Sequence, residues 1–296
     1  MGIFLLPVWR KFGQATLGLV VASLSMSLSD VAVGKEDSLF ASQLRAGEIV
    51  SVKDVIDGDT VVLTDGRQLR LVGIQAPKLP LGRKGFRAWP MAMAAKTALA
   101  ALVVEERMQL YIGGRDTDRH GRLLAHMRRV TDGAWVQGEM LGRGMARVYS
   151  FADNRAAVTA MLRVESEART AGRGIWALPY YQPRSHIDAA TYINAFQLVW
   201  GRVKSVARVR GDVYLNFGDN WRDDFTIKVG ARARRLFERE NVDLMALQGE
   251  NVEVRGWLRQ ENGPMIIITH PEQLAIRPVD IGGGQEGTDD LRYSEK

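Results

Sequence analysis

The stretch Val52–Lys78 reads VKDVIDGDTVVLTDGRQLRLVGIQAPK and decides the fold of the first half of the chain. Two runs rich in β-branched residues flank Asp65-Gly66, a pair that suits a tight hairpin turn because glycine adopts positive φ at little cost. Pairing of these runs would bring Asp59 and Arg70 onto neighbouring strands, so that a carboxylate and a guanidinium face one pocket. The alternative interpretation is a solvated hairpin with ordinary surface charges.

The residues around this hairpin predict a small barrel with helices packed on it. Alanine-rich or amphipathic runs predict helices at Arg87–Val104, Ala134–Gly142 and Asn154–Thr170, with Asp153 or Asn154 as a cap and Gly172 and Gly174 as the stop of the last one. Five runs have strand character: Ile49–Val55, Thr60–Leu63, Gln68–Ile74, Met108–Ile112 and Leu123–Arg128. Together they predict a mainly β fold with helices (α+β), whose barrel is of the oligonucleotide/oligosaccharide-binding (OB) type.

Charge and length set the outer limits on function. The chain has 296 residues, 46% of them hydrophobic, and therefore suffices for two domains. It contains no cysteine, which excludes disulfides and thiolate metal sites. Residues 35–180 carry 22 Lys/Arg against 16 Asp/Glu, whereas residues 181–296 carry 16 against 17. The positive excess in the first part is what a domain that meets a polyanion needs, although a generically basic surface would give the same count.

Three motifs in order give the first domain a family resemblance. They are Ile56-Asp57-Gly58-Asp59-Thr60-Val61, then Arg70-Leu71 with Pro77, then Asp118-Arg119-His120-Gly121-Arg122. On these residues the chain resembles the thermonuclease, or staphylococcal-nuclease-like, family from about Ala46 to Leu178. The resemblance implies an OB-type barrel, hydrolysis of nucleic acid, a calcium ion held by carboxylates, and two arginines on the scissile phosphate.

Carried over residue by residue, the resemblance gives three catalytic candidates. Asp59 matches the first metal carboxylate, and Arg70 and Arg122 match the arginines that clamp the phosphate. Arginine suits that task because its planar fork donates two parallel hydrogen bonds. Asp57 is interpreted as a turn-forming residue rather than a metal ligand.

The site also departs from the family pattern. Where the family has a second metal aspartate, threonine, proline and a glutamate base, this chain has Gln75-Ala76-Pro77-Lys78, and His120 replaces the usual tyrosine. A calcium ion wants about six to eight oxygen ligands, so Asp59 alone is an incomplete metal site and the cofactor stays open. Lys78 and His120 join Arg70 and Arg122 as candidate substrate-binding residues. We expect Lys78 to pair with Asp59 and to replace the metal.

These departures leave three hypotheses about function. The first is a phosphodiester hydrolase that acts on nucleic acid at an altered, calcium-independent site. The second is an inactive protein that binds nucleic acid or a nucleotide phosphate through its arginines, and the third is a structural or adaptor protein of the cell envelope. The retained arginines argue against the third hypothesis, and the missing acids argue against the first.

The two ends of the chain predict a signal peptide and a disordered tail. Arg10-Lys11, an uncharged run at Phe12–Ser29 and the small residues Ala32-Val33-Gly34 resemble a secretory signal peptide covering residues 1–34. A secreted or periplasmic protein is expected, with an uncleaved membrane anchor as the alternative and no other membrane segment. The glycine-rich and acidic residues 279–296 are expected to be a disordered tail.

A second domain is expected after the nuclease-like domain at 46–178 and a linker at 179–194. Residues 195–278 contain strand-like runs at Gln197–Val209, Val213–Phe217, Asp224–Val229, Asn251–Arg259 and Met265–Thr269. A basic helix, Ala231–Glu240, lies between the third and fourth runs. This order predicts a second, small OB-like β-barrel, with an SH3-like barrel as the alternative. Its role is expected to be support of the first domain, although its aromatic residues would also suit stacking on bases.

Overall fold

The computed structural model describes residues 42–277, which belong to one compact unit, Leu39–Lys296. The predicted signal peptide at 1–34 and tail at 279–296 therefore lie outside the described residues. Within 42–277, no helix combines the length and the apolar character needed to cross a membrane.

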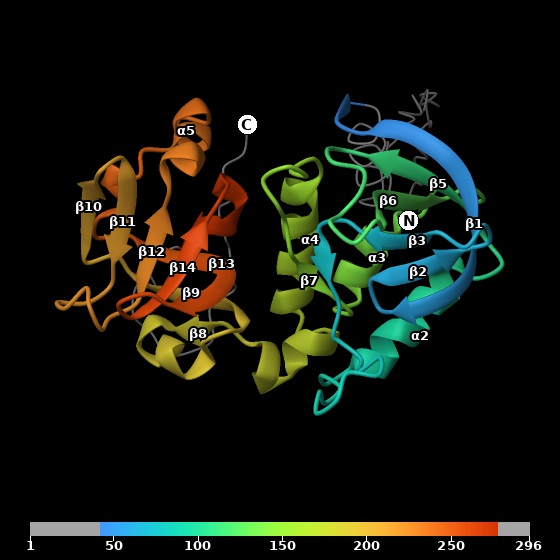
Figure 1. The fold of residues 1–296 in the computed structure, drawn as a ribbon, viewed down its shortest axis with the longest axis horizontal. Helices are drawn as coiled ribbons and strands as arrows, with labels where there is room; N and C mark the ends of the chain where they lie inside the picture. The colour runs from blue at the N-terminus through green and yellow to red at the C-terminus, as the bar shows by residue number, and fades with distance from the viewer. Residues whose placement is uncertain (1–41, 278–296) are drawn as a thin grey trace, which may run out of the picture. The chain divides into compact units, whose positions relative to one another are not determined.

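A closed five-stranded barrel forms the first part of the fold (Figure 1). Its order is β1-β2-β3-β6-β5. With 13 residues, β1 pairs with both β2 and β5, and its register with β2 shifts between Val52 and Asp54 and between Val55 and Asp57. Gly66 has a φ of +90°, as the predicted Asp65-Gly66 turn requires. The strands are β1 (Arg45–Asp57), β2 (Thr60–Leu63), β3 (Gln68–Leu71), β5 (Arg107–Ile112) and β6 (Leu123–Arg129).

The predicted third strand, Gln68–Ile74, is divided in the structure. β3 ends at Leu71, and Gly73 turns the chain with a φ of +82°. The next two residues form β4 (Ile74–Gln75), which leaves the barrel and pairs with β7 (Arg147–Val148). This exit brings Gln75 opposite Arg147 of β7.

Three helices accompany the barrel, and two of them begin later than the sequence predicts. α2 (Ala92–Val103) begins after Met91, whose φ of +66° interrupts the predicted Arg87–Val104 helix. α4 (Val158–Thr170) begins after Ala157, also at a φ of +66°. Asn154 is not its cap, because its side chain donates to the carbonyl of Arg115 at 3.1 Å. α3 (Val136–Gly142) lies close to its predicted bounds.

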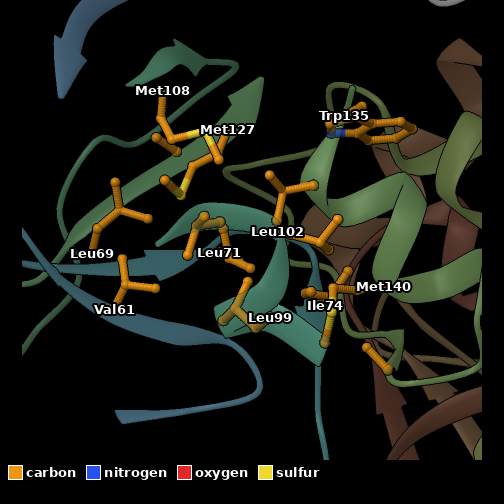
Figure 2. Packing of buried hydrophobic residues seen from close by; sticks show 14 of the residues in the cluster. Val61, Leu69, Leu71, Ile74, Leu99, Leu102, Met108, Met127, Trp135 and Met140 are labelled. Atoms are coloured by element: carbon orange, nitrogen blue, oxygen red, sulfur yellow. The ribbon is translucent and has the colours of Figure 1, made fainter. Parts of the chain in front are cut away.

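The barrel core is filled by aliphatic and methionine side chains that are removed from solvent. Val61, Leu69 and Leu71 point from the strands toward Leu99 of α2, and Met140 of α3 lies beside Ile74 (Figure 2). Each of these side chains is fully buried. Burial of an aliphatic side chain contributes about 1.5–3 kcal/mol, so this cluster holds the helices against the strands that carry the site.

The later strands repeat the order of the first barrel. The sheet runs β10-β11-β12-β14-β13-β9-β8. The predicted strand Gln197–Val209 is divided at Val203-Lys204, and its two halves lie at opposite ends of the β10-to-β9 series. Counted as one strand, they give the OB order with α5 (Ala231–Arg239) between the third and fourth strands. The strands are β8 (Arg184–Ser185), β9 (Phe196–Arg202), β10 (Ser205–Val209), β11 (Asp212–Asn216), β12 (Thr226–Val229), β13 (Asn251–Gln260), β14 (Pro264–Ile268) and β15 (Leu274–Ile276), which pairs with β13.

The predicted linker is made of short 3₁₀ helices that pack against both parts. Tyr181 is buried with Trp176, Phe196 and Leu198 in a separate apolar cluster. The helices η2 (Pro179–Tyr181) and η3 (His186–Tyr192) lie within the predicted linker at 179–194, η1 (Gly174–Ala177) lies before it, and η4 (Met245–Leu247) and η5 (Pro271–Gln273) follow later.

Two buried ion pairs join α4 to β13. Arg255 contacts Glu165 at 2.8 Å, and Arg169 contacts Glu253 at 2.8 Å, with all four side chains at most 5% exposed.

Candidate functional site

The candidate site is built on Asp59, which lies between β1 and β2 and is fully buried. Its carboxylate accepts a hydrogen bond from the backbone N–H of Ala76 at 2.8 Å and forms an ion pair with Arg70 of β3. The pairing of β2 with β3, in which Thr60 is opposite Arg70, brings the two side chains together. The structure thus contains the acid–guanidinium contact that the hairpin predicts.

Lys78 supplies the second cation of the cluster. Its Nζ lies 2.7 and 2.6 Å from the two carboxylate oxygens of Asp59 and 3.1 Å from Oδ2 of Asp57. The expected Asp59–Lys78 ion pair is therefore present. Asp57 also accepts from the backbone N–H of Asp59 at 3.1 Å, as expected of a turn-forming residue.

The two carboxylates of this cluster differ in their tendency to ionise. Burial opposes ionisation of Asp59, but the charges of Arg70 and Lys78 outweigh it and hold the pKa of Asp59 well below its ordinary value. Burial, followed by the charge of Asp59, raises the pKa of Asp57 despite the opposing effect of Lys78. Asp59 is thus an ionised partner for two cations, and Asp57 is the acid that takes a proton first.

The side chains around Asp59 do not fit the calcium ion that the resemblance implies. Both oxygens of Asp59 accept from Lys78, and the amide oxygen of Gln75 accepts from Arg147 at 3.0 and 2.8 Å. Throughout residues 42–277, no group of three or more His, Asp or Glu side chains is arranged to hold a metal. A hard cation that wants several carboxylate oxygens would have to displace the tethered ammonium.

Arg122 lies on a tight turn directly before β6. Asp118 accepts from the backbone N–H groups of His120 and Arg122 at 2.8 and 3.0 Å, and Gly121 has a φ of +77°. The same aspartate accepts from Arg122 Nε at 2.8 Å, so it fixes both the turn and the guanidinium. Burial opposes ionisation of Asp118, but its bonds to Arg122 lower its pKa.

The sheet places this turn next to the strand of Arg70. β3 and β6 run parallel, and Arg70 is opposite Leu124, two residues after Arg122. Asp59 is in direct contact with both Arg70 and Lys78, whereas the bonds of Arg122 are made to Asp118. His120 is exposed on the same turn, where its Nε2 accepts from Arg119.

Sequence reasoning misses two features of this region. The first is Arg147, which is buried, binds Gln75 and donates to the carbonyl of Phe196 at 3.1 Å. No signal in the sequence marks it, because its role depends on the pairing of β4 with β7. The second is the exposed loop after Lys78, which carries Arg83, Lys84 and Arg87 and is closed by a bond from Trp89 N–H to the Lys78 carbonyl at 2.9 Å.

Comparisons with known proteins show which family the first part of the chain is similar to. Residues 68–178 match the family model described as staphylococcal nuclease homologue. Protein ParB of Escherichia coli is 37% identical over 149 residues, which cover 47% of this chain and 76% of that protein. The thermonuclease of Staphylococcus intermedius is 27% identical over 138 residues, 44% of this chain and 77% of its own length. The probable staphylococcal-like nuclease CAN1 of Oryza sativa subsp. japonica is 32% identical over 116 residues, 39% of this chain and only 30% of its own length.

Proposed function

Because the chain belongs to the staphylococcal nuclease homologue family, we propose that it binds nucleic acid and hydrolyses phosphodiester bonds at a site that works without calcium. The observation that carries this proposal is the position of Lys78, whose ammonium lies within 2.7 Å of both oxygens of Asp59. The positive charge that a metal would supply is here covalently attached to the chain.

The chemistry follows from the charges of the cluster and of the neighbouring turn. Arg70 and Lys78 retain 13% and 19% exposure, so a phosphate can reach them while Asp59 stays buried. Fixed cations stabilise the negative charge that grows on the phosphoryl oxygens in the transition state, and Arg122 adds a planar fork from the turn before β6. The same turn carries His120, and histidine is the side chain that most often acts as the general base toward an attacking water.

A second candidate function is binding of nucleic acid without hydrolysis. It is favoured by the contacts of Asp57 and Asp59, since both carboxylates accept from Lys78 and neither is placed to act as a base. A third role, as an envelope scaffold, gives no use for the retained cations.

The experiment that separates these functions uses the full chain with labelled single-stranded DNA and RNA in calcium, in magnesium and in chelator. Cleavage at the same rate in chelator and in calcium is expected, and it should be lost in Arg122→Ala. Binding that persists without cleavage in all three conditions would support the second function instead. Cleavage that requires calcium would contradict the proposed site.

We also propose that the protein is exported, on the basis of the basic pair and apolar run of residues 1–34. Mass spectrometry of protein from the periplasm or medium should give a mature N-terminus near Lys35. Protein that keeps Met1 and stays in the cytoplasm would contradict this.

A further inference from the structure

A basic surface lies on the second part of the chain, where the β10–β11 hairpin meets α5. Residues 202–239 carry ten Lys/Arg against five Asp/Glu. The count for the whole second part hides this excess, because residues 240–296 carry eleven Asp/Glu against five Lys/Arg. We call it the arginine surface, and it consists of five exposed residues: Arg208, Arg210, Arg232, Arg235 and Arg239.

α5 presents three of these arginines on one face. Arg232, Arg235 and Arg239 follow one another at spacings of three and four residues, which places them on the same side of a helix. The opposite side carries Ala233 and Phe237, which are buried in the core of the second sheet. The exposed side of α5 is therefore a stripe of arginines about 10 Å long.

The hairpin brings two more arginines to the same end of the sheet (Figure 1). Its turn is Arg210-Gly211, and Nε of Arg234 in α5 donates to the Gly211 carbonyl at 3.3 Å. Arg208 is opposite Val213, which belongs to the core that also contains the buried residues of α5. Residues directly opposite each other lie on one face of a sheet, so Arg208 is on the face against which α5 packs.

The charges of the arginine surface are not neutralised by neighbouring acids. Among residues 42–277, none of its five arginines forms an ion pair. Glu238 of α5 pairs with Arg234, and Asp212 accepts from the backbone N–H of Ala231 at 3.0 Å. The acids closest along the chain are thus engaged by other groups, and the surface keeps its positive charge.

These arginines occupy positions that folding alone does not favour. Like charges three or four residues apart on a helix repel, and the first turn of α5 holds Arg232 and no acid, although a negative group is favoured there. Arg210 has a φ of +51°, a conformation in which glycine, asparagine and aspartate are the usual residues. A bound polyanion would relieve the repulsion, because it supplies the missing negative charge.

We propose that the arginine surface is a second nucleic-acid-binding site, which holds the phosphate backbone of a strand apart from the Asp59 cluster. The choice of nucleic acid among polyanions rests on the proposed function, since the chain belongs to a nuclease family. Arginine contacts to phosphate position a strand without reading its bases. Binding at this surface is therefore expected to be independent of base sequence and strongly dependent on salt.

The test is fluorescence anisotropy of the full chain with labelled single-stranded oligonucleotides, in chelator and at increasing salt concentration. Arg232→Ala with Arg235→Ala removes two phosphate contacts. It should weaken binding about 10- to 30-fold at about 0.1 M salt and reduce the slope of log K against log salt by about 1.4. Oligonucleotides of different base sequence should be affected alike.

A matched pair of substitutions keeps the result interpretable. Arg143→Ala with Arg163→Ala changes the net charge equally, and both arginines are exposed and paired with a glutamate four residues away. This control should bind like the parent. The midpoint of urea unfolding should not fall in Arg232→Ala with Arg235→Ala, because the change removes repulsion within α5. Weaker binding is then not a consequence of unfolding.

The outcomes separate this proposal from the proposed function. Oligonucleotide binding that requires Arg232 and Arg235, without cleavage in any condition, would support the arginine surface and contradict hydrolysis. Equal binding by the parent and both double variants would overturn the arginine surface and leave the proposed function standing. Parent protein that binds vesicles of anionic phospholipid through Arg232 and Arg235, with oligonucleotide binding unchanged in the double variant, would identify a membrane-binding surface and overturn the proposal.

Discussion

At the residue scale, the properties of the site depend on one buried carboxylate with two cations. Asp59 is fully buried, yet it remains ionised because Arg70 and Lys78 outweigh the effect of burial on its pKa. Removing one partner of such a cluster leaves the other charges buried without compensation. The cluster is therefore required for stability as well as for the proposed chemistry.

Asp59→Asn is expected to lower the free energy of unfolding by about 3–5 kcal/mol, the usual cost of breaking a buried ion pair from one side. Urea denaturation followed by circular dichroism measures it. Asp65→Asn is the matched control, since Asp65 pairs with Arg67 on the exposed hairpin turn, and it should have little effect. Similar losses of unfolding free energy in both variants would argue against a stabilising role of the Asp59 cluster.

The identity of residues 75 and 78 should decide whether the site responds to calcium. Gln75→Asp with Lys78→Glu replaces the amide and the ammonium with carboxylates around Asp59, the ligands that calcium prefers. Calorimetry should detect calcium binding in this double variant and none in the parent. Tight calcium binding by the parent that is lost in Asp59→Ala would restore a metal-dependent site.

Arg122 should contribute directly to binding of nucleic acid. Arg122→Ala is expected to weaken oligonucleotide binding by about 1–3 kcal/mol, and Arg122→Lys should recover little because it lacks the planar fork. Arg129→Ala is a close control, since Arg129 lies at the other end of β6 and pairs with Asp132 at 2.9 Å much as Arg122 pairs with Asp118. Fluorescence anisotropy with equal effects at both positions would contradict a specific role for Arg122.

At the element scale, α2 packs against the turn between β1 and β2, which carries Asp57 and Asp59. A Cβ on Gly58 would lie 2.6 Å from the Cβ of Ala76 and 2.7 Å from that of Ala95. The turn between β1 and β2 is thus in close contact with the helix and with the segment that donates to Asp59. Glycine is needed here for the close approach, because Gly58 is not among the residues with positive φ.

Gly58→Ala should therefore push α2 or the Ala76 segment away from the turn. We expect a loss of about 1–3 kcal/mol, the typical cost of an added methyl group in a well-packed region, together with weaker oligonucleotide binding. Gly82→Ala is the control, since a Cβ there meets open space in a loop. Its φ of +80° carries a small backbone strain of its own, so the comparison is of binding rather than of stability. Unchanged binding in Gly58→Ala would show that the turn does not depend on this packing.

At the scale of the whole molecule, the two parts of the chain are joined by buried charges and by a buried histidine. Glu165 of α4 binds two nitrogens of Arg255 at 2.8 and 3.1 Å. His270 contacts Ser150 through Nε2 at 2.7 Å and Thr269 through Nδ1 at 2.9 Å. These contacts tie α4 and the residues after β7 to the second sheet.

Stability should fall as the pH is lowered from about 6.5 to 4. Burial lowers the pKa of His270, helped by Arg155 and Arg255, to about 4, and burial also lowers the pKa of His126 to about 4. In the unfolded chain both histidines take up protons below about 6.5. The folded state therefore has its full stability above that pH and loses up to about 1.4 kcal/mol per pH unit for each histidine.

Urea titrations at pH 7.5, 6 and 5 measure this dependence. His270→Gln should reduce the slope of the free energy of unfolding against pH by about the contribution of one histidine. His120→Gln, at an exposed position, should leave that slope unchanged. A stability that stays constant down to pH 5 in the parent would contradict the two buried, neutral histidines.

The sequence by itself determined the elements and the local chemistry of this protein. The β-branched run Thr60–Val62, the alternating leucines of β3 and Asp65-Gly66 specify the two strands and their turn, because strand propensity and positive φ are local properties. The hairpin also predicted the contact of Asp59 with Arg70, and the family resemblance predicted the contact of Asp59 with Lys78.

Only the tertiary structure decided which other groups complete the site. Gln75 accepts from Arg147, which is 72 residues away in the chain, and this contact depends on the pairing of β4 with β7. Arg169 and Trp200 line one cavity because buried ion pairs join α4 to β13, which pairs with β9. Such contacts follow from the way whole elements pack, and packing is set by the shape of the complete core rather than by any stretch of the sequence.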